Sequence, residues 1–352
     1  MASFRLIPTY RDYLWGGDRL TAFYGKTNAP SPLAESWELS MHPDGPSCMA
    51  DGRTLEEALT PVMLGENATR FAFFPLLVKL IDAARDLSVQ VHPSDAYAMK
   101  YENSYGKTEM WYIVDATEGA GIYLGFRRDV TEAEIRTAIA ENTLIALLRF
   151  VPVRAGECYF IPAGTVHAIG AGCLICEIQQ NSNLTYRLYD YGRRDANGNT
   201  RPLHIDKALA VMHGKPYTPC GGFLPVEGEK TLGISRYFHA AECTLSGDTI
   251  LFADHASFRA LVCTKGEGTI DGEHIRAGDT YLIPAGERAL LSGTLVLVSV
   301  SVRRYTISKK ESELLLSDDL GRVHAKASSS DMTSEQFLSS YGLAPSDVEE
   351  NG

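Results

Sequence analysis

The feature that most constrains the fold is an internal repeat. The segment RAGECYFIPAG begins at Arg154 and returns as RAGDTYLIPAG at Arg276, with eight of eleven positions identical. A repeat of this kind indicates two related structural units within one chain. Each copy predicts a turn, a short strand and an Ile-Pro-Ala-Gly exit, because Pro and Gly shape the turn that ends a strand. The chain is therefore predicted to contain two related β-barrels.

The pattern around the repeat also favours a β-rich fold. Residues 71–302 form short apolar or alternating runs that end at Gly, Pro or Asn, as is typical of β-sandwiches and barrels. Helical patterns are fewer. They occur at residues 53–64 and, most clearly, at residues 131–148, where Thr131 and Glu134 predict a capping box. The predicted fold class is mainly β, with two jelly-roll barrels and a few peripheral helices.

Composition and charge exclude several classes of protein. The chain has 352 residues, 45% of them hydrophobic, which is ample for a packed core. Its formal net charge of −11 argues against nucleic acid or an anionic membrane as a partner. The N-terminal segment lacks the pattern of a signal peptide, and the apolar stretch FAFFPLLVKLI is short and contains Pro75 and Lys79. These features predict a cytoplasmic protein.

The cysteines indicate a reducing compartment. Seven cysteines without a regular framework favour free thiols. Cys173 and Cys176 form a lone C-x-x-C pair, but residues three apart on a strand point to opposite faces. We therefore expect two core residues here rather than a metal clamp.

Four side chains form a candidate metal site in the first repeat. Gln90 and His92 are two residues apart, so on a strand they face the same side. Glu109 follows in GKTEMWYIV, and His167 follows the repeated turn. Two imidazoles, a carboxylate and an amide oxygen suit Zn²⁺, Mn²⁺ or Fe²⁺. An offset of 122 residues places Ala289 at the position of His167, so the metal is expected in the first repeat alone.

A histidine taken alone is more often a packed core residue than a ligand, and the combination is what favours a metal. For the remaining histidines we expect surface or structural roles, with His42 as a candidate to line a pocket. The run QQNSNLTYRLYDYGRR follows a buried strand and places Gln179, Asn181, Asn183, Thr185 and Arg187 on one predicted face. Amide, hydroxyl and guanidinium groups suit sugar oxygens, although a solvent-facing strand edge would also explain them.

The chain resembles the type I mannose-6-phosphate isomerases, in particular their short bacterial form. The resemblance spans residues 4–302, and the segments that carry it are DYLWGG, AESWELS, LSVQVHP, GKTEMWYI, IPAGTVHAIG and EIQQNSNLTYRLYDYGR. It implies a bicupin fold, one Zn²⁺ per chain and reversible interconversion of mannose 6-phosphate and fructose 6-phosphate through an enediol. The repeat and the composition predict an N-terminal region with a catalytic metal-binding barrel at 1–215, a degenerate second barrel at 216–308 and a polar tail without strands at 309–352, and the tail has no counterpart in the family.

The resemblance also implies roles for individual residues. His92, Glu109 and His167 match the zinc ligands of the family, Gln90 matches a fourth ligand of its longer members, Arg187 matches a catalytic arginine, and Lys107 and Lys79 match active-site lysines. One departure is Asn183, which stands where many members have Asp, so a proton-transfer role for that Asp does not carry over. Phosphate recognition stays open among Lys79, Lys100, Arg193 and Arg194.

Alternatives remain at this stage. Two histidines and a carboxylate also suit the iron of a non-haem dioxygenase, although the polar Gln/Asn/Arg face disfavours it. A cupin isomerase of non-phosphorylated sugars and a sugar-binding cupin without catalysis share the same residues. The partner expected is a small sugar phosphate, with the protein as a monomer or homodimer.

Overall fold

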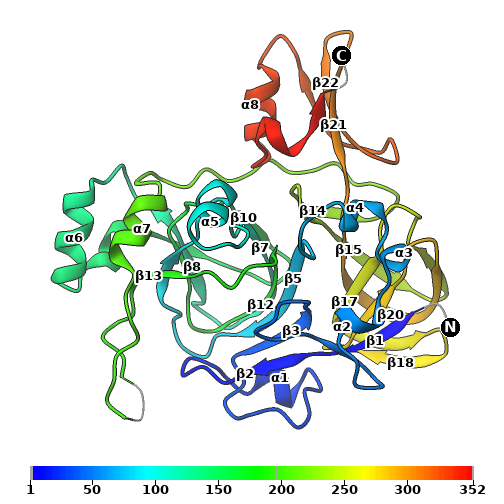
Figure 1. Ribbon diagram of the computed structural model, residues 1–352, viewed down its shortest axis with the longest axis horizontal. Coiled ribbons are helices and arrows are strands. Elements are labelled where there is room, and N and C mark those ends of the chain that lie inside the picture. The colour runs from blue at the N-terminus through cyan, green and yellow to red at the C-terminus, as the bar shows by residue number, and fades with distance from the viewer. Residues whose placement is uncertain (1–2, 195–196, 351–352) are drawn as a thin grey trace.

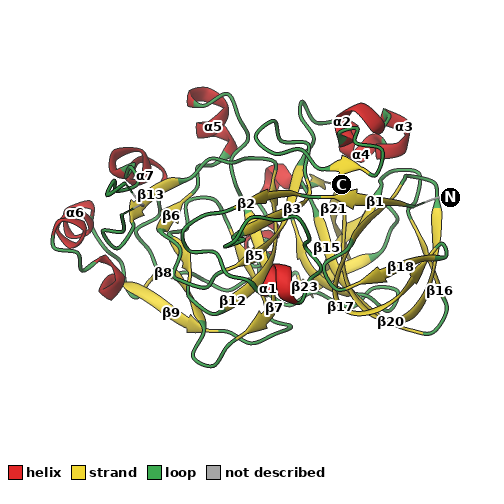
Figure 2. Ribbon diagram, turned by 90° about the horizontal axis from the view of Figure 1, so that it is seen from below, coloured by secondary structure: helices red, strands yellow, loops and turns green. Residues whose placement is uncertain are grey.

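The computed structural model describes residues 3–194 and 197–350, and it is dominated by antiparallel strands (Figure 1). Strands from the two repeats form two neighbouring β-rich units, and a smaller C-terminal unit projects from them. Helices lie around the edges of this strand-rich body, as Figure 2 shows. The mainly β fold class predicted from the sequence is confirmed.

The first β-unit contains two sheets with the strand orders β10-β7-β12-β5-β3-β2 and β13-β6-β11-β8-β9. Their bounds are β2 Thr9–Arg11, β3 Glu35–Leu39, β5 Leu76–Asp82, β6 Val89–Val91, β7 Glu109–Ala116, β8 Gly121–Phe126, β9 Leu148–Pro152, β10 Cys158–Ile161, β11 His167–Ile169, β12 Cys173–Gln180 and β13 Tyr186–Tyr189. Alternating apolar side chains of β5, β7 and β12 fill the space between the sheets. Cys173 and Cys176 on β12 pack into different core clusters, as the strand pattern predicts.

The second β-unit is one large sheet built around the order β14-β15-β20-β17-β19-β1-β4, with β16 and β18 paired to β20 and β17. Its bounds are β1 Phe4–Ile7, β4 Cys48–Met49, β14 Lys230–Ile234, β15 His239–Ser246, β16 Thr249–Phe252, β17 Arg259–Ile270, β18 Glu273–Arg276, β19 Thr280–Ile283 and β20 Arg288–Ser301. The first strand of the chain, β1, pairs with β19. The domain boundary at residue 215 stays a prediction. It does not anticipate that the first strand of the chain belongs to the second β-unit.

The two copies of the sequence repeat occupy equivalent strands. β10 and β19 are offset by the 122 residues of the repeat, and each pairs antiparallel with the long strand beside it, β7 or β17. Next to these lie β12 and β20, in the same order. The repeat read from the sequence is thus a structural repeat, and positions of one unit can be matched to the other through strand register.

The helices are short, with the bounds α1 Arg19–Ala22, α2 Leu55–Ala58, α3 Pro61–Leu64, α4 Glu66–Thr69, α5 Asp95–Tyr101, α6 Glu132–Ala140 and α7 Ile205–Val211. The predicted capping box is confirmed, because Thr131 Oγ1 accepts from Glu134 N and the Glu134 carboxylate accepts from Thr131 N. The predicted helix at 53–64 is interrupted between α2 and α3, where Pro61 starts a second helix capped by Thr60. No helix within the described ranges is both long and apolar enough to cross a membrane.

The sequence predicts a polar tail without strands at 309–352, and this prediction is wrong. The C-terminal unit contains β21 Tyr305–Lys310, β22 Glu313–Asp318, β23 Val323–Ser328, α8 Ser334–Ser339 and β24 Glu349–Glu350. Leu314 and Leu316 alternate on β22 and pack with Phe337 and Leu338 of α8 in a separate hydrophobic cluster, to which Ile234 of β14 also belongs. The outward-facing residues of each strand are polar. Because they are so many, the few apolar positions that stabilise this unit gave no clear strand pattern in the sequence.

Candidate metal centre and its cavity

Strands from both sheets of the first β-unit bring the candidate ligands together. Gln90 of β6 pairs with His167 of β11 on one side and with Arg187 of β13 on the other. Glu109 begins β7, and His92 directly follows β6. His167 Nε2 lies 3.2 Å from Glu109 Oε1, and His92 Nε2 lies 3.5 Å from Glu109 Oε2. The ligand atoms of His92, Glu109 and His167 all lie within 4.8 Å of one another.

Backbone carbonyls fix the orientation of both imidazoles. His92 Nδ1 lies 2.7 Å from Leu184 O, and His167 Nδ1 lies 2.9 Å from Thr165 O. A carbonyl only accepts hydrogen bonds, so each Nδ1 carries the proton and each Nε2 is unprotonated, with a lone pair that could bind a metal. Second contacts of this kind orient metal-binding histidines in general. The two lone pairs face the Glu109 carboxylate.

The Glu109 carboxylate supplies the test of whether a metal fits. It is fully buried, and neither of its oxygens accepts a hydrogen bond of good geometry within the described residues, although Lys107 Nζ lies 2.9 Å from Oε2. A single lysine leaves most lone pairs of this buried carboxylate unused, and a divalent cation would satisfy them together with the two imidazoles. The side chain of Gln90 lies 3.4 Å from His167 Nε2, where a turn of its amide would offer an oxygen. The donor set therefore fits a divalent metal ion.

The protonation of these groups also favours a cation. Burial raises the pKa of Glu109 to about 7, against the opposing effect of Lys107. Burial lowers the pKa of His167 to about 4 and holds the pKa of His92 well below its usual range, where Lys107 adds to the effect. Both histidines are thus neutral near pH 7, which is the form that binds a metal.

A cavity of about 310 Å³ opens beside the ligands. Its walls carry four cationic side chains, Lys79, Lys107, Arg187 and Arg201, and two carboxylates, Glu35 and Glu177. The other polar residues that line it are Tyr13, Ser88, Gln90, Asn183 and Thr185. The cavity walls therefore have two formal positive charges in excess, in a protein whose overall charge is negative.

Lys79 is part of a buried ion-pair network. Its Nζ lies 3.3 Å from Glu177 Oε2 and 3.5 Å from Glu35 Oε2. Burial alone would lower the pKa of Lys79, but these two carboxylates outweigh burial and raise it. Burial would likewise raise the pKa of Glu177, yet Lys107 and Lys79 bring it to about 2. Lys79 and Glu177 are both charged near neutral pH, and their ion pair fixes a lysine at the wall of the cavity.

Two guanidinium groups share another wall. Arg187 Nε donates to Ser88 Oγ over 3.2 Å, and Arg187 Nη1 donates to Pro202 O over 2.9 Å. Partial burial lowers the pKa of Arg187, and the neighbouring charge of Arg201 adds to this effect. Arg201 is held by Asp190, with an Nε–Oδ2 distance of 2.8 Å. Like charges gathered at one cavity are unfavourable in the absence of an anion, so this wall is suited to an anionic ligand.

The four predicted metal ligands and the three predicted active-site cations all lie at this site. Gln90, His92, Glu109 and His167 lie at the centre, and Lys79, Lys107 and Arg187 lie around the cavity. Three other cations proposed for phosphate do not line it. Lys100 lies over the Tyr101 ring on α5, Arg193 is paired with Asp190, and Arg194 donates to Gly198 O.

Sequence reasoning missed several residues of the site. Glu177 is a charged residue within the apolar CLICEI strand, and that placement was a usable signal because a buried charge needs a partner. Arg201 and Ser88 gave no such signal. The predicted polar stripe is broken, because Gln179 donates to the carbonyls of Gln180 and Ser182 while Asn183, Thr185 and Arg187 line the cavity.

Comparison with known proteins places this site in a family. Residues 3–123 match the model of the catalytic domain of type I phosphomannose isomerases. A mannose-6-phosphate isomerase of Streptococcus mutans is 36% identical over 282 residues, which cover 77% of this chain and 89% of the relative. The mannose-6-phosphate isomerase ManA of Bacillus subtilis is 38% identical over 296 residues, which cover 79% and 92%.

Solved structures give the same result. The crystal structure of mannose 6-phosphate isomerase from Bacillus subtilis has a TM-score of 0.76 at 34% identity, over 86% of this chain and 99% of that one. The apo enzyme from Salmonella typhimurium, with a TM-score of 0.67 at 22% identity over 85% and 99%, shares the fold. The sequence identity and the coverage of the relatives show that the chain belongs to the type I phosphomannose isomerase family.

Proposed function

We propose that this protein is a zinc-dependent aldose–ketose isomerase that interconverts mannose 6-phosphate and fructose 6-phosphate through an enediol. The observation that carries the proposal is a buried His92–Glu109–His167 cluster, suited to a divalent metal, beside a cavity with excess positive charge. Relatives named mannose-6-phosphate isomerase, at 36% and 38% identity over most of their length, support the choice of substrate.

The charge of the cavity favours a phosphorylated sugar over a neutral one. A phosphate monoester carries nearly two negative charges at neutral pH, which matches the two excess positive charges of the lining residues. We propose that Arg187 and Arg201 lie nearest the phosphate group or the negatively charged enediolate. Lys79 is fixed on another wall of the cavity. An isomerase of free sugars would gain nothing from this excess of cations.

The chemistry requires removal of a proton beside the sugar carbonyl, stabilisation of the enediolate and return of the proton to the adjacent carbon. Zinc at His92, Glu109 and His167, with Gln90 as a fourth ligand, would supply a Lewis acid for the sugar oxygens. We propose that Lys107 and Arg187, which line the cavity, stabilise the negative charge on the enediolate oxygens. Lys79 holds substrate through its fixed ammonium group. The buried position of the site excludes bulk water and strengthens these interactions.

The dioxygenase alternative has less support. Substrate oxidation by iron requires no excess of cationic side chains around the metal, whereas binding of a sugar phosphate does require it. A sugar-binding protein without catalysis would not need Lys107 and Lys79 beside a buried carboxylate suited to a metal. One zinc ion per chain, a cytoplasmic location and a monomer or homodimer remain predictions from the sequence and its resemblance.

The proposal is tested by incubating the zinc-loaded protein with mannose 6-phosphate in D₂O and following the reaction by NMR. An enediol pathway predicts fructose 6-phosphate that carries deuterium at C1, because the abstracted proton exchanges with solvent before it is returned. Free mannose serves as the neutral control and should react far more slowly. Turnover of free mannose alone, oxygen consumption, or binding of mannose 6-phosphate without turnover would contradict the proposal.

A further inference from the structure

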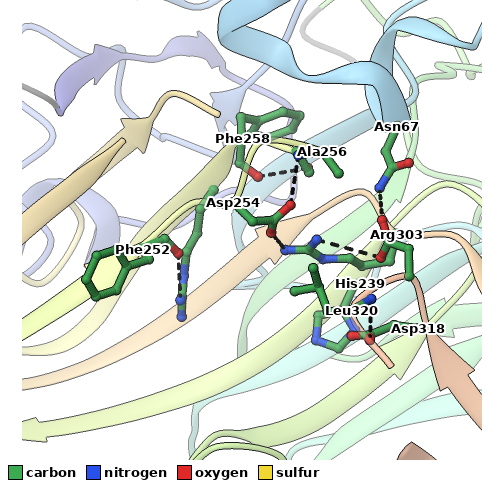
Figure 3. Close-up of polar contacts among 12 residues, drawn as sticks. Asn67, His239, Phe252, Asp254, Ala256, Phe258, Arg303, Asp318 and Leu320 are labelled. Atoms are coloured by element: carbon green, nitrogen blue, oxygen red, sulfur yellow. Dashed lines mark hydrogen bonds and ion pairs between the residues drawn. The ribbon is translucent and has the colours of Figure 1, made fainter. Parts of the chain in front are cut away.

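A second polar cavity, of about 330 Å³, lies between the second β-unit and the C-terminal unit. Its walls come from strands β15, β16, β17 and β20, and Leu320 and Arg322 of the C-terminal unit complete them. Figure 3 shows Arg303 directed toward Asp254, with Phe252, His239 and Leu320 around the same region. This cavity shares no residue with the cavity beside the metal ligands.

Strand register shows that the two cavities are equivalent positions of the repeat. Ile161 of β10 pairs with Glu109 in the first unit, and Ile283 of β19, offset by 122 residues, pairs with Arg259 in the second. Arg259 therefore occupies the position of the metal-binding carboxylate. Arg259 lines the second cavity, and Glu109 lies next to Lys107, which lines the first.

The other functional positions are also replaced. His167 pairs with Gln90 in the first unit, whereas in the second unit Ala289 pairs with Leu251. Glu177 pairs with Lys79 in the first unit, whereas Ser299 pairs with Ala241 in the second. The second unit has thus exchanged a metal site for a guanidinium group, a hydroxyl group and small apolar residues, while a cavity of similar volume is retained.

The polar groups of the second cavity are held in place by one another. Arg259 Nε donates to Ser299 Oγ over 2.9 Å, and Arg259 Nη2 is paired with Glu229. Arg303 is buried and paired with Asp254, and its Nη1 lies 3.7 Å from Asp319 Oδ1, yet Nε and Nη1 donate no hydrogen bond in the part of the chain that the structure describes. A buried guanidinium with unused donors is costly unless another molecule satisfies the site.

Charge separates the two cavities. The second is lined by three arginines, Arg259, Arg303 and Arg322, and by three carboxylates, Glu227, Glu229 and Asp254, so its formal charges balance. Burial holds the pKa of His239 well below its usual range, so this histidine adds no charge at neutral pH. A phosphate group would gain no net attraction here, in contrast to the cavity beside the metal ligands.

We propose that the second cavity is a binding site for a neutral, polyhydroxylated molecule of monosaccharide size. Guanidinium donors and carboxylate acceptors are held side by side, an arrangement that suits the adjacent hydroxyl groups of a sugar or cyclitol. Phe252 and Leu320 line the same cavity with 60% and 48% of their surfaces exposed, and they offer an apolar surface for a ring. The site has no metal ligand at the equivalent positions, so it binds without catalysing isomerisation.

The test measures binding of D-mannose, D-fructose and myo-inositol to the full-length protein by ligand-observed NMR and calorimetry. Two variants address the second cavity. Glu229→Gln removes a carboxylate acceptor at nearly constant shape, and Phe252→Ala removes an exposed ring whose loss should not affect folding. Glu313→Gln, an exposed carboxylate on β22, is the matched control, and thermal unfolding of each variant checks the fold. Arg187→Ala reports on binding in the cavity beside the metal ligands.

The proposal predicts that at least one neutral polyol binds and that each second-cavity variant weakens its binding about tenfold. Glu313→Gln and Arg187→Ala should leave that affinity unchanged. No binding of any neutral polyol at tens of millimolar would overturn the proposal, as would binding that only Arg187→Ala abolishes, or a second cavity occupied by mannose 6-phosphate alone. These readouts do not depend on turnover, so they stand apart from the test of the isomerase.

Discussion

Lys107 Nζ lies 2.9 Å from Glu109 Oε2, at the carboxylate that we propose as a metal ligand. The same nitrogen lies 3.2 Å from His92 Nε2. A divalent ion bound to this carboxylate would repel the ammonium group strongly in a buried site. Metal binding is therefore expected to turn Lys107 toward the cavity that it already lines, where its charge becomes available to the substrate.

Replacement of the Glu109 carboxylate, the proposed metal ligand, should abolish both metal retention and activity. Glu109→Gln keeps the shape but removes the charge that balances the cation, so kcat/KM for mannose 6-phosphate should fall at least about 100-fold. Metal content measured by atomic emission should fall in parallel. His274→Ala, a change of an exposed histidine, is the control and should retain both. Full metal content in Glu109→Gln would argue against this site.

Arg187 should tolerate no replacement, lysine included. The guanidinium contacts Ser88 and Pro202 through different nitrogens, and a lysine cannot reproduce this fork. If Arg187 stabilises the enediolate, Arg187→Lys should lower kcat by about 100-fold with a smaller change in KM. Steady-state kinetics would separate the two parameters. An unchanged kcat with a raised KM would assign Arg187 to binding alone.

Arg201 should act chiefly on binding of the phosphate. Arg201→Ala removes one of the two excess positive charges of the cavity, so KM for mannose 6-phosphate should rise about tenfold. Arg194→Ala is the matched control, since Arg194 does not line the cavity. Equal effects of the two substitutions would contradict a specific role of Arg201.

The repeat and the cluster of candidate metal ligands were predictable from the sequence because their determinants are local. The turn of RAGECYFIPAG and the spacing of Gln90 and His92 depend on neighbours in the chain, and the strands that they predict are present. The resemblance then added Lys79, Lys107 and Arg187, all of which lie at the cavity.

The features that the sequence did not predict depend on packing between residues that are far apart in the chain. Arg201 comes to the cavity from the loop after β13 and is fixed there by Asp190, a contact without a pattern in the sequence. The pairing of β1 with β19 joins the start of the chain to the second unit. The C-terminal unit rests on a few apolar residues, such as Leu316 and Phe337, spaced among many polar ones.

The C-terminal unit should depend strongly on one aromatic side chain. Phe337 of α8 is fully buried in the core of this unit, so Phe337→Ala should destabilise it by about 3–5 kcal/mol through lost burial and a cavity. Denaturant unfolding followed by hydrogen exchange of β21–β23 would measure the loss. Glu335→Ala on the same helix is the control and should change little. A small loss of stability in Phe337→Ala would show that this side chain does not hold the C-terminal unit together.

Stability around His239 should fall in mild acid. His239 is buried, with Nδ1 2.6 Å from the Tyr305 hydroxyl, and it faces His324, Arg303, Arg322 and Asp318. Burial lowers its folded pKa, so below about pH 6.5 the unfolded chain binds a proton that the folded one does not. Stability is then lost as the pH falls, by up to about 1.4 kcal/mol per pH unit for this group. A chemical-denaturation series from pH 8 to about 5, compared with His239→Gln, should show a weaker dependence in the variant. Identical slopes would refute the assignment.

Zinc-dependent isomerisation is most directly tested by one coupled assay of fructose 6-phosphate formation from mannose 6-phosphate. The purified protein is measured as prepared, after removal of metal with a chelator, and after addition of zinc. A zinc-dependent isomerase should lose activity on chelation and regain it with zinc at one equivalent per chain. Absence of turnover by the zinc-loaded protein, or activity that survives complete metal removal, would contradict this function.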